Sequence, residues 1–230
     1  MKKTAGKNRR MGICGICNKE VAKSQIARHL KTCLPALAAE TDKSVAWFHL
    51  AVECPYLPAY WLHVAIPGAK TLRDLDRFLR DVWLECCGHL SGFAINDVRY
   101  ECQPADEKLF GGPPDQSMSA KIDKVLEPGM EFSHEYDYGS TTDLVLTVAG
   151  VFQAPLVRGD SVRLLARNLP PEFRCAGCGK PATLLADGGN GLDPKNCYCK
   201  DCSEELDEEE QDMLMPIVNS PRVGVCGYCG

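Results

Sequence analysis

Residues 60–82 read YWLHVAIPGAKTLRDLDRFLRDV, and the hydrophobic period changes partway along this stretch. Its first part, residues 60–66, is an aromatic and β-branched run of strand length. Thr71 then stands where a helix N-cap belongs, with Asp74 at the third helical position, as in a capping box. The apolar residues that follow recur at helical spacing: Leu72, Leu75, Phe78, Leu79 and Val82. The stretch therefore predicts a strand followed by an amphipathic helix that ends near residues 87–88.

The segments around this stretch predict more strands than helices. Residues 45–52 form a second run of strand length, and a turn at Pro55 and Pro58 separates it from the first. Further strands are predicted at 93–95, 98–100, 142–152 and 161–165, with a Gly-Pro loop at 111–114 and a short helix near 120–126. The fold class expected is α+β, with a central mixed sheet and one main amphipathic helix, flanked by two small zinc-binding modules.

Cysteine spacing and composition divide the chain into three expected domains. Residues 1–43 hold a basic tail and a zinc finger, 44–168 the α+β body, and 169–230 a cysteine-rich zinc module of treble-clef or ribbon type. Linkers are expected at 34–43 and 168–173, the second marked by Pro170 and Pro171.

The composition is that of an ordinary globular chain with unusual cysteine use. The 230 residues are 45% hydrophobic and 25% charged, which excludes disorder throughout. Fourteen cysteines are too few for a disulfide scaffold of this length and favour metal binding. The basic N-terminus lacks the apolar run of a signal peptide, and no stretch approaches the ~20 apolar residues of a membrane span. We expect a cytoplasmic protein with no membrane contact.

Charge is unevenly distributed along the chain. The formal net charge is -5, yet residues 1–43 hold ten basic side chains against Glu20, Glu40 and Asp42, which gives +7 there. Residues 201–212 instead carry eight carboxylates, a run that no compact core could bury. This run is interpreted as a solvated helix face, with two alternatives: an intramolecular clamp on the basic N-terminus, or a surface that repels nucleic acid.

Residues 14–33 have the ligand spacing of a zinc finger. Cys14 and Cys17 enclose two residues, and His29 and Cys33 follow at positions i and i+4. A two-residue gap lets one turn direct two thiolates at a tetrahedral ion, while the i, i+4 pair shares one helix face. Ser24 is expected to cap this helix. The segment resembles the ββα zinc-finger family, with a cysteine where a second histidine is usual.

The expected finger helix carries basic residues that could follow a phosphate backbone. They are Lys23, Arg28 and Lys31, with Gln25 beside them. DNA or RNA is therefore one expected partner, through the N-terminal segment. One finger alone reads about 3 base pairs, so little sequence specificity is expected. A protein-docking finger is the equal alternative.

A second metal module is expected in residues 175–229. Three pairs with two-residue gaps occur there: Cys175/Cys178, Cys199/Cys202 and Cys226/Cys229. Gly after Cys178 fits a zinc knuckle, and Ser203 followed by carboxylates predicts a helix start at the second pair. The first choice is one zinc held by the first two pairs, as in a treble clef. A ribbon that uses the first and third pairs is the alternative, and an iron–sulfur cluster is the less favoured metal group.

Under the first choice Cys226 and Cys229 need other partners. The cysteines available for this are Cys54, Cys86, Cys87, Cys102 and Cys197. The spacing does not choose among them.

Four stretches of the body and C-terminal part resemble the pRiA4b open-reading-frame-three-like family. They are YWLHVAIPGAKTLRDL at 60–75, GHLSGF at 88–93, FSHEYDYG at 132–139 and NSPRVGVCGY at 219–228. The resemblance spans most of residues 45–230 and implies an α+β body, association with mobile elements and no established reaction. Ser91 stands where the family tends to have a second histidine, and Ser140 where it tends to have aspartate, so a family site at these positions is depleted here.

His89, His134, Tyr136 and Asp137 are a possible acid–base group, because histidine and aspartate exchange protons near neutral pH. The simpler interpretation is that His134 and Tyr136 share one strand face and His89 caps a helix end. Likewise Cys86 and Cys87 are interpreted as packing residues rather than a reactive pair.

No phosphate-binding loop or hydrolase motif occurs in the chain, and no catalytic residue is assigned. The sequence thus favours a zinc-stabilised binding or adaptor protein, with nucleic acid as the expected ligand. The alternatives are a hydrolase-like or nuclease-like enzyme with a site in the body, and a purely protein–protein interaction module.

Overall fold

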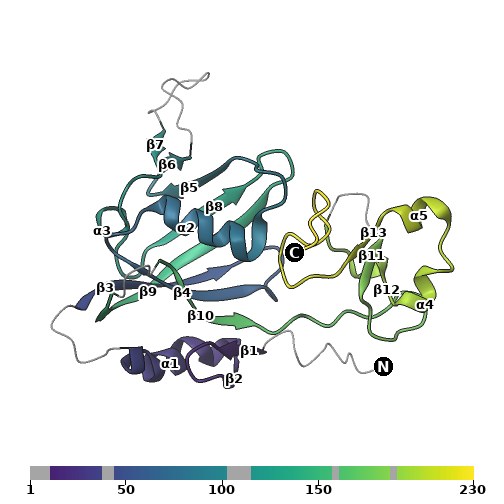
Figure 1. Cartoon of the computed structure of the whole chain (residues 1–230), viewed down its shortest axis with the longest axis horizontal. Helices are drawn as coiled ribbons and strands as arrows, with labels where there is room; N and C mark the ends of the chain where they lie inside the picture. The colour runs from purple at the N-terminus through teal and green to yellow at the C-terminus, as the bar shows by residue number, and fades with distance from the viewer. Residues whose placement is uncertain (1–10, 38–43, 103–114, 157–160, 187–190) are drawn as a thin grey trace.

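The computed structural model describes residues 11–37, 44–102, 115–156, 161–186 and 191–230. Within these ranges ten strands form one sheet in the order β2-β1-β10-β4-β3-β9-β8-β5-β6-β7 (Figure 1). Neighbouring strands are antiparallel except β6 and β7, which are parallel. The strands are β1 (Met11–Cys14), β2 (Glu20–Ala22), β3 (Ser44–Glu53), β4 (Trp61–Pro67), β5 (Ser91–Ile95), β6 (Val98–Glu101), β7 (Gln116–Ser117), β8 (Glu131–Tyr136), β9 (Thr142–Pro155) and β10 (Arg163–Asn168). The α+β class expected from the sequence is confirmed.

Helix α2 (Leu72–Leu79) is the main amphipathic helix of the body. Thr71 and Asp74 form the expected capping box, in which each side chain bonds the other residue's backbone amide. A single π-helical turn, Arg80–Leu84, extends the helix to Glu85, close to the expected end. The predicted apolar face is confirmed: Leu72, Leu75 and Leu79 are fully buried, while Phe78 and Val82 pack at its edge.

All seven residues of β4 are buried, which would not occur in a sheet that is covered on only one face. Leu62, Val64 and Ile66 belong to the core beneath α2. Trp61 and Ala65 belong instead to a second core, beneath the N-terminal helix. Alternate residues of β4 point to opposite faces and a layer covers each face, so Trp61 belongs to the sheet beneath α2 while its side chain packs on the other side.

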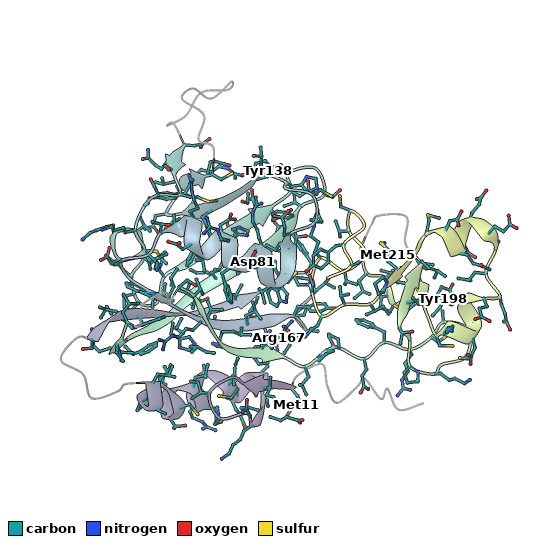
Figure 2. The ribbon with its side chains drawn as sticks, viewed as in Figure 1. Met11, Asp81, Tyr138, Arg167, Tyr198 and Met215 are labelled. Carbon is teal, nitrogen blue, oxygen red and sulfur yellow. The ribbon has the colours of Figure 1, made fainter. Side chains whose placement is uncertain are left out.

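The N-terminal module forms that second layer (Figure 1). Its hairpin of β1 and β2 leads into α1 (Lys23–Cys33) and a 3₁₀ turn, Leu34–Leu37. β1 pairs with β10, so the hairpin extends the large sheet, and Met11 and Arg167 mark this junction in Figure 2. A Cβ on Gly12 would lie 2.3 Å from the Trp61 ring, so only glycine permits this approach.

The predicted strands of the body are present in order, whereas β7 was not predicted and β8 was expected only from the simpler interpretation of His134 and Tyr136. β5 and β6 form a hairpin whose two turn residues, Asn96 and Asp97, both have positive φ, as a type I′ turn requires. The short helix α3 (Ile122–Val125) falls inside the predicted range. The Gly-Pro loop predicted at 111–114 lies outside the described residues.

A separate three-stranded sheet, in the order β12-β11-β13, organises the C-terminal module. It consists of β11 (Leu184–Ala186), β12 (Cys197–Tyr198) and β13 (Leu214–Pro216), and Tyr198 and Met215 mark it in Figure 2. A 3₁₀ turn, Pro194–Asn196, and two short helices, α4 (Lys200–Ser203) and α5 (Glu208–Asp212), complete the module.

Two helix caps expected from the sequence were wrong. Ser203 ends α4 rather than starting a helix, because Cys199 is the N-cap of α4 and Asp207 caps α5. In the finger, α1 starts after Ala22 with no side-chain cap, one position before Ser24. Strand β2 runs directly into α1, so Ser24 already lies inside the helix and cannot be its N-cap.

Candidate metal centres

Three groups of Cys and His side chains gather in the described parts of the chain. In each group the ligand atoms all lie within 4.8 Å of one another. We name them the finger cluster (Cys14, Cys17, His29, Cys33), the C-terminal cluster (Cys175, Cys178, Cys199, Cys202) and the junction cluster (Cys86, Cys87, His89, Cys226). All fourteen cysteines are free thiols.

The finger cluster unites the four residues that the sequence spacing singled out. His29 Nε2 lies 3.3 Å from both Cys17 Sγ and Cys33 Sγ. In a tetrahedral zinc site, with Zn–S bonds of ~2.3 Å and Zn–N bonds of ~2.0 Å, a sulfur lies ~3.5 Å from a nitrogen and ~3.8 Å from another sulfur. The observed separations therefore match the edges of such a tetrahedron.

Local structure explains how the finger cluster forms. The hairpin turn presents Cys14 and Cys17, and the residue after the pair, Asn18, has a left-handed φ of 58°. The backbone amide of Lys19 lowers the pKa of Cys17 to about 7, against a smaller opposing effect of desolvation. A thiol with a lowered pKa gives up its proton to a metal more readily.

The apolar side of the finger helix supports the cluster from beneath. Ile26 and Leu30 are buried and share a core with Trp47 and Trp61 of the sheet. The finger thus packs on the body rather than standing apart from it. That packing fixes which side of α1 faces solvent.

The C-terminal cluster joins the first two cysteine pairs of the module. Cys178 Sγ lies 3.6 Å from Cys199 Sγ, again close to a tetrahedral edge. The backbone amide of Cys199, followed by those of Cys178 and Gly177, lowers the pKa of Cys175 to about 6. These are the contacts expected of a knuckle, and Gly179 has the expected positive φ of 72°. This is the first-choice pairing of the sequence analysis, and Cys226 lies elsewhere.

Gly177 is also needed inside the knuckle. A Cβ at this position would lie 3.1 Å from Cys202 Sγ and 3.3 Å from Cys202 Cβ. Such contacts are closer than side chains normally tolerate, so glycine lets the loop close around the four sulfurs.

The sequence analysis did not predict the junction cluster. Cys86, Cys87 and His89 follow the π-helical turn of the body, and Cys226 comes from the C-terminal segment. Cys86 is half-buried and packs against the core, whereas Cys87 is exposed, so the expected packing role holds for Cys86 alone. The short pattern Cys-Cys-x-His was the local signal that could have indicated ligands here. Cys229 stays outside all three clusters, and its Sγ contacts the Gly227 carbonyl.

A buried arginine lies directly beside the junction cluster. Arg222 is fully buried, donates to Asp137 Oδ2 at 2.6 Å and lies 3.4 Å from Cys86 Sγ. Burial raises the pKa of Cys86, but hydrogen bonds with Arg222 and Tyr136 outweigh it and hold that pKa below its usual value. Sequence reasoning assigned no role to Arg222.

The possible acid–base group gathers only in part. His89 Nε2 lies 3.6 Å from Asp137 Oδ2, and its ring meets Tyr136 edge to face. His134 is fully buried and bonds Asp76 at 2.8 Å. His134 and Tyr136 do share one face of β8, as the simpler interpretation held. The Asp137 carboxylate is already engaged by Arg222, so these residues do not form one open acid–base site.

The candidate nucleic-acid contacts of the finger differ in availability. Lys23 pairs with Glu53 at 2.8 Å and also donates to the Pro58 carbonyl. Arg28 and Lys31 are exposed on α1. In the acidic run seven of the eight carboxylate side chains are exposed, and Glu210 is half-buried. The solvated interpretation of that run is confirmed for these residues.

The fold and the clusters define an α+β protein with Cys/His groups that could each hold a metal ion. In the described ranges, no helix is both long and apolar enough for a membrane crossing. No family model and no curated protein matches the chain. Among solved structures, the chain is similar to MM3350, a protein of unknown function from Methanosarcina mazei Go1. That similarity has a TM-score of 0.42 and 17% identity, and covers 53% of this chain and 67% of the other.

Proposed function

We propose that the chain is a zinc-stabilised binding protein whose N-terminal finger contacts nucleic acid. Zinc is the metal we assign to the finger and C-terminal clusters. Three thiolates with one imidazole, or four thiolates, are ligand sets typical of closed structural zinc sites. Free thiols throughout agree with a reducing, cytoplasmic setting, which is part of the same proposal.

The observation that carries the proposal is the orientation of α1. Its apolar side is used against Trp47 and Trp61, which leaves Arg28 and Lys31 on the outer side of a helix held in place by the sheet. Between α1 and the hairpin lies a groove of about 530 Å³ whose lining includes Lys19, Gln25 and Arg28. Basic and amide side chains on a fixed helix suit contacts with phosphates.

The charge distribution also favours the N-terminal finger as the place where nucleic acid binds. The first ten residues add five basic side chains next to the finger in sequence. The exposed carboxylates of residues 201–212 belong to a different module, where they would disfavour nucleic acid. The resemblance to the mobile-element family is compatible with a nucleic-acid partner, and membership of that family is part of the proposal.

The test is a binding titration with the full chain and short duplex DNA and single-stranded RNA at low salt. The variant R28A/K31A should bind at least about tenfold more weakly than the intact chain, since each lost phosphate contact weakens binding. The matched control is K121A/K124A, which removes two exposed lysines from the region of α3. If neither nucleic acid binds the intact chain, or both variants lose affinity equally, the proposal is wrong and protein docking becomes the finger's role.

A further inference from the structure

The junction cluster brings together three potential ligands from the body and Cys226 of the C-terminal segment, which stands 139 positions after Cys87. Cys87 Sγ lies 3.9 Å from Cys226 Sγ, and His89 Nε2 lies 3.4 Å from the same sulfur. These separations correspond to the ~3.8 Å and ~3.5 Å edges of a tetrahedral zinc site. A disulfide would instead need ~2.05 Å between sulfurs. We propose that Cys86, Cys87, His89 and Cys226 hold a further zinc ion, which fastens the C-terminal segment to the body.

The backbone around Cys226 supports a site at this position. Cys226 has a φ of 52°, which is uncommon for a residue other than glycine, asparagine or aspartate. Gly224 and Gly227 on either side have φ values of 81° and 69°. The chain therefore turns sharply here, and the turn directs the Cys226 thiol at the other three ligands. Strain of this kind persists only where the surrounding contacts require it.

Arg222 supplies a second, independent support. It is fully buried and anchored by Asp137, Thr142 and the Ser140 carbonyl, and both its Nε and its Nη2 lie 3.4 Å from Cys86 Sγ. Three thiolates around one divalent cation leave an excess negative charge. A guanidinium that donates to one of these sulfurs stabilises the thiolate form.

The ligand set is closed, which gives the ion a structural rather than a catalytic role. Four protein ligands fill a tetrahedral site and leave no position for a substrate. Asp137 lies 3.6 Å from His89 Nε2, but its carboxylate binds Arg222 and is not needed as a ligand. The ion would join the loop after the π-helical turn to the segment that follows β13.

The experiment counts zinc per chain in the full-length protein, purified under reducing conditions, by elemental analysis. We expect three equivalents for the intact chain and two for Cys226→Ser. Cys229→Ser is the matched control, because Cys229 is also exposed in the same segment but lies outside the cluster, and it should keep three. Equal zinc content in Cys226→Ser and Cys229→Ser overturns the proposal, whatever the total bound by the intact chain.

Cobalt substitution provides a readout that needs no variant. Titration of the metal-free full chain should saturate at three equivalents of Co²⁺, with thiolate charge-transfer bands growing to the third. Saturation at two equivalents, with Cys87 and Cys226 still open to alkylation in the metal-loaded chain, would overturn the proposal. Protection of Cys87 and Cys226 from alkylation reports on this cluster alone, so failure of the zinc proposed for the other two clusters is observed separately.

Discussion

Arg222 and Asp137 form a buried ion pair of 2.6 Å between residues that stand 85 positions apart in the sequence. Asp137 begins the turn after β8 with a φ of 65°, and its Oδ1 accepts from the backbone amides of Gly139 and Ser140. Arg222 has no exposed surface. The pair therefore attaches the C-terminal segment to a turn of the central sheet.

Arg222→Met should destabilise the chain by about 3 kcal/mol. The change leaves the Asp137 carboxylate buried without its counter-ion, and breaking one side of a buried pair costs about that much. The measurement is denaturant unfolding at pH 7. Arg77→Met, an exposed arginine of α2, is the control and should change stability by less than about 0.5 kcal/mol. Equal effects of the two changes would contradict the role given to the pair.

Leu75→Ala should cost roughly 2–5 kcal/mol, the range for large-to-small changes in a core. Leu75 is fully buried and lies in the core between α2 and the sheet, with Leu146 of β9 in the same core. Chemical denaturation of the two proteins measures the difference. A cost below about 0.5 kcal/mol would show that this face of α2 is not buried.

Local pattern and tertiary contact contributed differently to what the sequence could predict. The Thr71–Asp74 capping box and the i, i+4 pair of His29 and Cys33 depend on neighbouring residues, and both are present as expected. The covering of Trp61 by the finger could not be predicted, since alternation shows two faces but not which layer packs on each.

The junction cluster could not be predicted from the sequence, for a related reason. Cys87 and Cys226 are 139 positions apart, and spacing rules apply only to ligands that one turn or one helix brings together. Arg222 was equally hidden, because nothing in a single sequence marks an arginine that will be fully buried. The misplaced caps at Ser24 and Ser203 show that a good capping residue does not fix a helix start when a strand or a metal ligand already does.

Removing the zinc proposed for the finger cluster should release the finger from the sheet. The segment is short, and without a metal the four ligands no longer join its hairpin to α1, so its packing on Trp47 and Trp61 should weaken. Cys17→Ser, or chelation of the intact chain, should expose Trp61 and raise proteolytic cleavage near β1. Tryptophan emission and mass mapping of the fragments measure this. A chain whose emission ignores chelation would exclude a metal-dependent finger.

Two buried histidines beneath the finger should make its attachment sensitive to acid. His49 Nε2 and His63 Nδ1 lie 2.8 Å apart. Desolvation, with Lys31 nearby, lowers the pKa of His49 to about 4, and desolvation together with His49 and Lys23 lowers that of His63 to about 3. In the unfolded chain both pKa values are ~6.5. Below that value the unfolded state binds more protons than the folded state, so stability falls as pH drops from ~6.5 toward 4.

Each of these histidines should contribute a slope of about 1.4 kcal/mol per pH unit in that window. His49→Gln should therefore flatten the pH dependence of unfolding between pH 6 and 4.5 by about one proton. Thiolate protonation at the metal clusters affects both proteins alike, so the difference between them isolates His49. Identical slopes for the variant and the intact chain would show that His49 is already protonated in the folded state.

The proposed contact with nucleic acid should depend strongly on salt. Contacts with about five phosphates predict that log affinity for duplex DNA falls with log salt at a slope of about -4 to -5, because each neutralised phosphate releases counterions. Deleting residues 1–10, which hold five of the ten basic residues in the N-terminal 43, should flatten this slope.

Arg28→Ala should weaken binding about equally for all sequences, since phosphate contacts carry no base information. Gel shifts at two or more salt concentrations, with intact and truncated chains, measure both effects. A slope that survives the deletion unchanged would place the contact outside the N-terminal tail, and sequence-dependent losses for Arg28→Ala would indicate a base contact instead.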